Sequence, residues 1–221
     1  MKCVLIIPAA GSGSRFNSKI PKQFYKLDGK EILIHTIEKF TKIKEIDAFI
    51  IATRKVYFEK IIKLFFKFEI QKPFKVVAGG KERHDSVYNA LLNSGCKEGD
   101  IILVHDSVRP YITGKLIKEL IGYAKKYKAV IPVLNISDTL KEVKNGFIKK
   151  TIPREDLKRA QTPQAFEYTL LLKAFKKAEK EKFKGTDEAA VAEHNGVKVK
   201  VIQGDILNIK ITQKSDLKHS E

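Results

Sequence analysis

The segment PAAGSGSRFNSKIPKQF, residues 8–24, places flexible glycines and fixed positive charges directly after an apolar run. Glycine lets backbone N–H groups approach a bound phosphate without an intervening side chain. The segment lacks the third glycine of a dinucleotide fingerprint, because residue 16 is Phe16, and it lacks the Gly-Lys-Ser/Thr of a P-loop. An ordinary strand-to-helix turn remains an alternative. Arg15 and Lys22 favour a polyphosphate site.

The second candidate segment is LVHDSVRP, residues 103–110, in which an apolar run leads into Asp106 and then Arg109. An aspartate at the carboxyl end of a central strand lies where ligands bind, and it pairs with Mg²⁺ or a ribose hydroxyl. Arg109 adds an anion-binding group to the same loop. The alternative is an aspartate that only caps a local turn.

The third segment, AGGKERHDSV at residues 78–87, has two glycines at a predicted strand end and polar residues that lead into a helix. Asp85 or Ser86 would cap that helix in one interpretation. In the other, Ser86 and the glycine backbone read the edge of a base. The residues leave both open. The five histidines form no HExxH or triad-like set, and Cys3 and Cys96 have no metal-like or redox-like spacing.

Short apolar runs alternate with amphipathic stretches along the chain, which is the pattern of repeated β-α-β units. The predicted strands are KCVLIIP, IDAFIIAT, PFKVVAG, DIILVHD and AVIPVLN, followed later by VKVKVIQ and NIKIT. The predicted helices are Glu31–Phe40, Tyr57–Phe68, Asp85–Leu92, Leu116–Tyr127, Glu167–Lys180 and Asp187–His194. We expect an α/β fold with a doubly wound, mainly parallel sheet (Rossmann-like) and ligands at the carboxyl ends of its strands.

After Asn135 the pattern changes to two strands around a Lys-Asn-Gly turn, at about 136–157. Asn-Gly is a strong hairpin signal, and an isolated two-stranded hairpin has little core of its own. We therefore expect a protruding arm that packs on a second copy of the chain. The whole of 1–221 is predicted to be one domain that includes this arm.

The formal net charge of +17 first suggests nucleic acid as a partner. Of the 43 basic residues, 37 are lysines spread over stretches that resemble solvated helix faces, which disfavours a nucleic-acid patch. A basic nucleic-acid-binding protein without catalytic activity remains an alternative. No apolar run is long enough to span a membrane, and no signal peptide is evident, so we expect a cytoplasmic protein.

Seven sequence blocks in order resemble the 2-C-methyl-D-erythritol 4-phosphate cytidylyltransferases, a family of nucleotidyltransferases that activate sugar phosphates. The blocks are PAAGSGSR, PKQF, AGGKERHDSV, VHDSVRP, TPQAF, TDEA and NIKIT, and they span almost the whole chain. The resemblance implies transfer of the cytidylyl group of CTP to methylerythritol phosphate with release of pyrophosphate, in non-mevalonate isoprenoid biosynthesis. It also implies a homodimer and Mg²⁺ bound mainly through the CTP phosphates, with no dedicated metal-ligating residues.

The resemblance also implies roles for individual residues. Four cations match catalytic positions, with Arg154 donated by the neighbouring subunit: Arg15, Lys22, Arg154 and Lys210. The positions that hold the cytidine nucleotide are Ala9, Ala10, Gly11, Gly13, Gly79, Ser86 and Asp106. The positions beside the alcohol phosphate are Asp106, Arg109, Thr139, Thr162 and Thr186.

The nearest alternative is the ribitol 5-phosphate cytidylyltransferase group, which shares the fold and the PKQF, TPQ and NIKIT blocks. PAAGSGSR, ERHDSV and TDEA favour the methylerythritol group.

Overall fold

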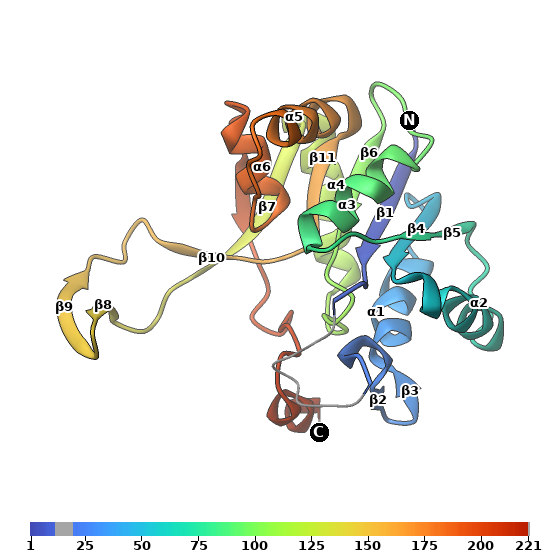
Figure 1. Ribbon diagram of the computed structural model, residues 1–221, viewed down its shortest axis with the longest axis horizontal. Coiled ribbons are helices and arrows are strands. Elements are labelled where there is room, and N and C mark those ends of the chain that lie inside the picture. Colours follow the sequence, from blue (N-terminus) through green and yellow to red (C-terminus); the bar gives the residue numbers. More distant parts are fainter. Residues whose placement is uncertain (12–19, 221) are drawn as a thin grey trace.

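The computed structural model of the protein describes residues 1–11 and 20–220 (Figure 1). Its central sheet has the strand order β10-β7-β11-β6-β1-β4-β5, and β12 pairs with β7. The strands are β1 Cys3–Pro8, β4 Ala48–Thr53, β5 Phe74–Ala78, β6 Ile101–Val104, β7 Ala129–Asn135, β10 Lys158–Ala160, β11 Gln164–Glu167 and β12 Lys200–Gln203. β1 pairs in parallel with β4 and β6, and β4 with β5. The predicted mainly parallel α/β sheet is confirmed.

The sequence analysis missed two strands of the central sheet, β11 and the short β10. β11 lies antiparallel between β6 and β7, and β10 is also antiparallel to β7. β11 has the sequence QAFE, with buried Gln164, Ala165 and Phe166 and no β-branched residue. Four residues without alternation give no strand signal, so tertiary pairing decides this segment.

Helices cover both faces of the sheet (Figure 1). They are α1 Ile32–Thr41, α2 Phe58–Lys67, α3 Arg83–Leu92, α4 Gly114–Tyr127, α5 Tyr168–Lys180 and α6 Glu188–His194, each within a few residues of its predicted bounds. Leu5 and Ile7 of β1 pack with α1, α2 and α4, whereas Val4 and Ile6 pack with α3, α5 and α6. Successive side chains of a strand point to opposite faces, so β1 contributes to two hydrophobic layers.

The predicted hairpin is confirmed as a separate two-stranded sheet of β8 (Leu140–Lys144) and β9 (Phe147–Ile152). Asn145 and Gly146 have φ values of 51° and 84°, the left-handed conformations that a tight hairpin turn requires. The arm projects away from the central sheet (Figure 1). Val143, Phe147 and Ile148 are 59%, 80% and 65% exposed on it, so these apolar side chains are not buried against the described part of the chain.

The predicted strand NIKIT is wrong. Residues 208–212 adopt no regular structure, although Ile211 is buried and its N–H donates to the carbonyl of Val108 over 2.9 Å. The alternating pattern therefore reflects burial on one side of a loop. The remaining short elements are η2 Lys22–Phe24, β2 Lys26–Leu27, β3 Lys30–Glu31, η3 Lys55–Tyr57 and η4 Lys214–Ser220. Among the described residues, none of the helices is long and apolar enough to cross a membrane.

Candidate active site

A cavity opens beyond the carboxyl ends of β1 and β6, where the loops after β1, β5 and β6 meet η2 and the segment 208–212. The residues singled out from the sequence that line it are Ala10, Gly11, Lys22, Ser86, Asp106 and Lys210. Arg83 and Gln23, which the sequence analysis did not single out, line it as well. Five of the seven sequence blocks thus converge on one hollow at the end of the sheet where α/β folds bind ligands.

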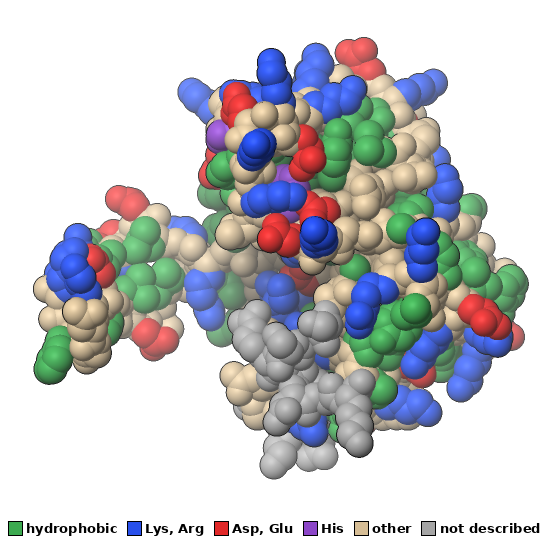
Figure 2. Space-filling model, in the orientation of Figure 1, with side chains coloured by type: hydrophobic (Ala, Val, Ile, Leu, Met, Phe, Trp, Pro, Cys, Tyr) green, Lys and Arg blue, Asp and Glu red, His purple; other side chains and the backbone are tan. Residues whose placement is uncertain are grey.

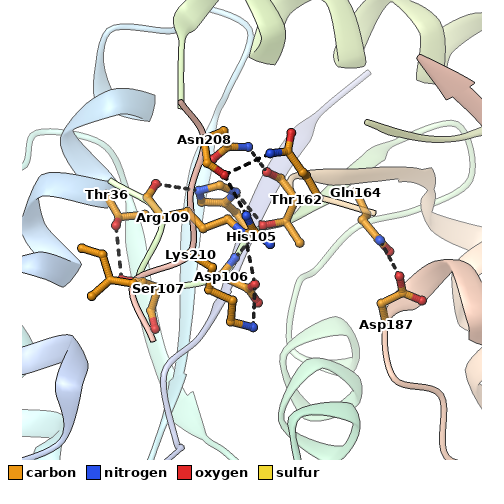
Figure 3. Close-up of polar contacts among 12 residues, drawn as sticks. Thr36, His105, Asp106, Ser107, Arg109, Thr162, Gln164, Asp187, Asn208 and Lys210 are labelled. Atoms are coloured by element: carbon orange, nitrogen blue, oxygen red, sulfur yellow. Dashed lines mark hydrogen bonds and ion pairs between the residues drawn. The ribbon is translucent and has the colours of Figure 1, made fainter. Parts of the chain in front are cut away.

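The carboxylate of Asp106 lies at the centre of a cluster of cations (Figure 3). Its Oδ2 is 2.9 Å from Nζ of Lys210 and 3.3 Å from Nε of Arg109, and its Oδ1 accepts from Nε of Arg83 at 3.1 Å. Burial opposes the charged form of this carboxyl, but Arg83, Lys210 and Arg109 hold the pKa of Asp106 well below its usual range. Asp106 is therefore an anion that fixes three cations.

His105 and Thr162 form a hydrogen-bonded chain behind Asp106 (Figure 3). His105 Nε2 lies 3.2 Å from the Arg109 carbonyl, which only accepts, so Nε2 carries the proton. Nδ1 then accepts from the Thr162 hydroxyl at 3.0 Å, and that oxygen accepts from the Asp106 N–H at 3.1 Å. Complete burial lowers the pKa of His105 to about 3, so the ring stays neutral.

Hydrogen bonds, in place of strand pairing, hold the irregular segment that carries Lys210. Arg109 Nη1 donates to the carbonyl of Asn208 over 2.8 Å, and Asn208 Nδ2 donates to the carbonyl of Thr162 over 2.7 Å. Gln161 Nε2 donates to the Asn208 carbonyl as well, at 3.1 Å. The NIKIT and TPQAF blocks are thereby joined side by side.

Gln23 fixes the beginning of the glycine-rich loop. Its buried Nε2 donates to the carbonyl of Ala9 at 2.6 Å and to that of Gly11 at 3.3 Å. The Thr53 hydroxyl also donates to the Ala9 carbonyl, at 3.2 Å. These side chains hold both carbonyls and so fix the direction in which the backbone leaves β1. Lys22, the residue before Gln23, lines the cavity.

The glycines of the AGG block are required by close approach. A Cβ on Gly79 would lie 2.5 Å from the Ala10 Cβ, and one on Gly80 would lie 2.1 Å from the Asp85 Cβ. The Ser86 hydroxyl accepts from the Gly80 N–H and donates to the Glu82 carbonyl, both at 3.0 Å. Asp85 accepts from the Glu82 N–H at 3.1 Å, as a helix cap does. The capping interpretation is confirmed for Asp85, whereas the reading of a base by Ser86, which lines the cavity, stays a prediction.

Three of the predicted site residues lie away from this cavity in the same chain. Thr139 and Arg154 belong to the base of the arm, where Arg154 donates to the Ser137 carbonyl. Thr186 is exposed just before α6. Gly13 and Arg15 lie outside the described residues.

The described residues contain no group of three or more His, Cys, Asp or Glu that could hold a metal ion. Asp106 is the carboxylate of the cation cluster, and its two oxygens already contact three cations. This donor set does not fit a resident Mg²⁺, which prefers several free oxygen ligands.

Lys and Arg side chains are scattered over the face of the molecule in Figure 2, without a single dense patch. On this face of the molecule the distribution matches the solvated lysines expected from the sequence.

Comparisons with known proteins identify the family of this chain. Residues 3–221 match the family model described as 2-C-methyl-D-erythritol 4-phosphate cytidylyltransferase. A relative of that name from Clostridioides difficile is 42% identical over 98% of this chain and 91% of its own, and one from Bacillus anthracis is 39% identical over 96% and 93%. The crystal structure of the Francisella tularensis enzyme of that name superposes with a TM-score of 0.87 at 34% identity, covering 100% of this chain and 98% of that one. The chain belongs to the 2-C-methyl-D-erythritol 4-phosphate cytidylyltransferase family.

Proposed function

We propose that this cavity transfers the cytidylyl group of CTP to 2-C-methyl-D-erythritol 4-phosphate, giving 4-diphosphocytidyl-2-C-methyl-D-erythritol and pyrophosphate. A phosphate oxygen of the alcohol attacks the α-phosphorus of CTP, and the bond from that phosphorus to the bridging oxygen of pyrophosphate breaks. Negative charge grows on the oxygens around phosphorus, so fixed cations are the groups that the step needs. The convergence of Lys22, Lys210 and Asp106 on one cavity is the observation that carries this proposal.

The nucleotide side of the cavity is formed by the loop after β1 and the glycines after β5. The residues proposed to hold CTP are Ala9, Ala10, Gly11, Gly13, Gly79, Ser86 and Asp106. Gly79 lies so close to Ala10 that a larger side chain at residue 79 would not fit into this wall of the cavity. A narrow slot of this kind favours a pyrimidine over a purine. We assign Lys22 and Arg15 to the charge on the triphosphate and the transition state.

The alcohol phosphate is assigned to the opposite side, beside Asp106 and Lys210. Lys210 and Arg109 already share Oδ2 of Asp106, so an incoming phosphate would find two cations held near one point. Thr186 is proposed to add a hydroxyl contact. The Thr162 hydroxyl donates its proton to His105 and accepts from the Asp106 N–H, so toward substrate it is left to accept from a hydroxyl group of the alcohol and not to bind the phosphate.

A homodimer would bring Thr139 and Arg154 to the alcohol phosphate of the neighbouring subunit. Both residues lie at the base of the arm, which projects from its own chain (Figure 1). The exposed Val143, Phe147 and Ile148 on the arm support burial against another surface. Sedimentation of the purified protein at several concentrations would test this oligomeric state.

We propose that Mg²⁺ enters as the complex with CTP, because the described residues form no site of their own for it. Neutralisation of the triphosphate charge is the chemistry that the ion supplies. CTP is a cytoplasmic metabolite, so the reaction is assigned to the cytoplasm.

Pyrophosphate release with Mg²⁺ tests the proposal. CTP is compared with ATP, GTP and UTP, and methylerythritol phosphate with ribitol 5-phosphate. Release confined to CTP with methylerythritol phosphate is expected. Faster turnover of ribitol phosphate would keep the chemistry and reject the substrate, whereas no release with any pair would reject the activity. Tight, salt-dependent binding to nucleic acid would then support the alternative that the chain is a basic nucleic-acid-binding protein.

A further inference from the structure

The ion pair between Arg83 and Glu188 joins two residues that the sequence analysis did not single out. It holds the carboxylate of Asp106, which lies at the centre of the candidate site. The guanidinium of Arg83 donates from Nη1 to Oε1 of Glu188 at 2.7 Å and from Nη2 to Oε2 at 3.0 Å. The Glu188 side chain is 1% exposed, so both of its oxygens are buried against the fork of Arg83. Bidentate pairs of this geometry are among the strongest and most directional contacts in proteins.

The third donor of the same guanidinium continues to the active site. Nε of Arg83 donates to Oδ1 of Asp106 at 3.1 Å, which leaves Oδ2 to Lys210 and Arg109. One planar group thus bridges two carboxylates and fixes the rotation of the second. Burial opposes the charge on Arg83, but Glu188 and Asp106 raise its pKa above the ordinary value, so the bridge stays charged.

Glu188 is itself held by the TPQAF block. The Ala189 N–H donates to Oε1 of Gln164 at 2.9 Å, and Gln164 Nε2 donates to Oδ2 of Asp187 at 2.8 Å (Figure 3). Oδ1 of Asp187 accepts from the Ala190 N–H at 2.9 Å and caps α6. The start of α6 is therefore fixed to β11, and the position of Glu188 follows from that.

Glu188 also balances part of the positive charge of the cations around Asp106. Arg83, Arg109 and Lys210 supply three positive charges, and Asp106 and Glu188 supply two negative ones, so the net charge of the five is one positive. Without the carboxylate of Glu188 the net charge is two positive. Arg83 would then draw on Asp106 alone and compete for it with Lys210 and Arg109.

We propose that Glu188 and Arg83 are positioning residues of the cytidylyltransferase reaction. Their pair keeps Oδ1 of Asp106 occupied and Oδ2 turned toward Lys210 and Arg109, and so sets these two cations for the alcohol phosphate. The inference rests on the proposed function. It differs from a direct contact of Arg83 with CTP, because a direct contact would make the affinity for CTP depend on Arg83.

The test uses Glu188→Gln, which keeps the size of the side chain and removes its charge. Calorimetry with CTP alone and with the product 4-diphosphocytidyl-2-C-methyl-D-erythritol requires no turnover. We expect product affinity to fall about tenfold, the scale of one loosened charge-assisted hydrogen bond, and CTP affinity to fall by less, because Asp106 is only one of several residues proposed to hold CTP. The control Glu38→Gln removes the carboxylate of the Lys30–Glu38 pair, 2.7 Å apart and away from the cavity, and should change neither affinity.

A double substitution separates positioning from packing. In the background Asp106→Asn, Glu188→Gln should cause no further loss of product affinity, because Glu188 acts through Asp106. An equal loss in both backgrounds would overturn the proposal, as would an unchanged product affinity of Glu188→Gln. A parallel loss of CTP and product affinities would reveal a merely structural role. If wild-type protein does not bind the product at all, the proposed function fails, which is a separate result.

Discussion

The Thr162 hydroxyl lies 3.0 Å from Nδ1 of His105 and donates its proton to that ring, while its oxygen accepts from the backbone N–H of Asp106. Both groups belong to the VHD block, and Thr162 lies 56 residues beyond Asp106 in the chain. The hydroxyl therefore fixes the orientation of the peptide that carries the central carboxylate of the site.

Thr162→Val should destabilise the protein and loosen the residues that are proposed to bind the alcohol phosphate. The substitution leaves the Asp106 N–H and His105 Nδ1 buried without their partner, at a cost of about 2 kcal/mol in the free energy of unfolding. Thr162→Ser should restore most of this stability. Urea denaturation checks the prediction, with Thr41→Val as a control whose hydroxyl bonds only within its own helix end. A Thr162→Val protein as stable as the wild type would contradict it.

His105 should make the protein less stable as the pH falls from about 6.5 toward 3. Burial lowers the pKa of the folded-state ring to about 3, so below its ordinary value the unfolded chain binds a proton that the folded one does not. Stability is therefore fully present above pH 6.5 and is lost on acidification. The loss from this group at pH 5 is about 2 kcal/mol.

Urea denaturation at pH 7.5 and pH 5 measures this loss. His105→Gln provides the comparison because glutamine does not titrate, and its free energy of unfolding should change less between the two pH values. The same change in both proteins would show that other groups cause the acid sensitivity.

The sequence predicted most of the fold because buried parallel strands and amphipathic helices have distinct periodicities. It failed at β11, whose QAFE has no strand pattern, and at NIKIT, whose alternation comes from a loop buried on one side. Asp106 was singled out from its place after a predicted strand and Lys210 from the family resemblance, whereas Arg83, Glu188 and Gln23 were missed. These three act through pairings between distant blocks, and no local spacing reveals them.

Gly79→Ala should weaken CTP binding. The new Cβ would lie 2.5 Å from the Ala10 Cβ, so one wall of the proposed nucleotide slot must move. Overpacking of this kind costs about 1–3 kcal/mol, and we expect the KM for CTP to rise about tenfold with a smaller effect on kcat. Gly122→Ala is the matched control, because its Cβ meets nothing within 4 Å. An unchanged KM for CTP in Gly79→Ala would place the nucleotide elsewhere.

Lys22→Ala should lower kcat by several hundredfold, as the removal of one oxyanion-type donor does, with a smaller effect on CTP affinity. Lys22 lines the cavity next to Gln23, which fixes the loop after β1. Single-turnover kinetics with saturating CTP isolates the chemical step. Turnover at the wild-type rate would show that another cation stabilises the transition state.

Arg154→Ala should raise the KM for methylerythritol phosphate while leaving CTP affinity unchanged, since Arg154 is assigned to the neighbouring subunit's site. Lys22→Ala and Arg154→Ala chains, mixed under conditions of subunit exchange, test the shared site. In a mixed dimer, one of the two sites combines the intact Lys22 of one chain with the intact Arg154 of the other. Activity at subsaturating methylerythritol phosphate should therefore exceed the sum of the two variants measured alone. No gain, despite exchange verified by mass spectrometry, would mean that each chain uses its own Arg154 or none.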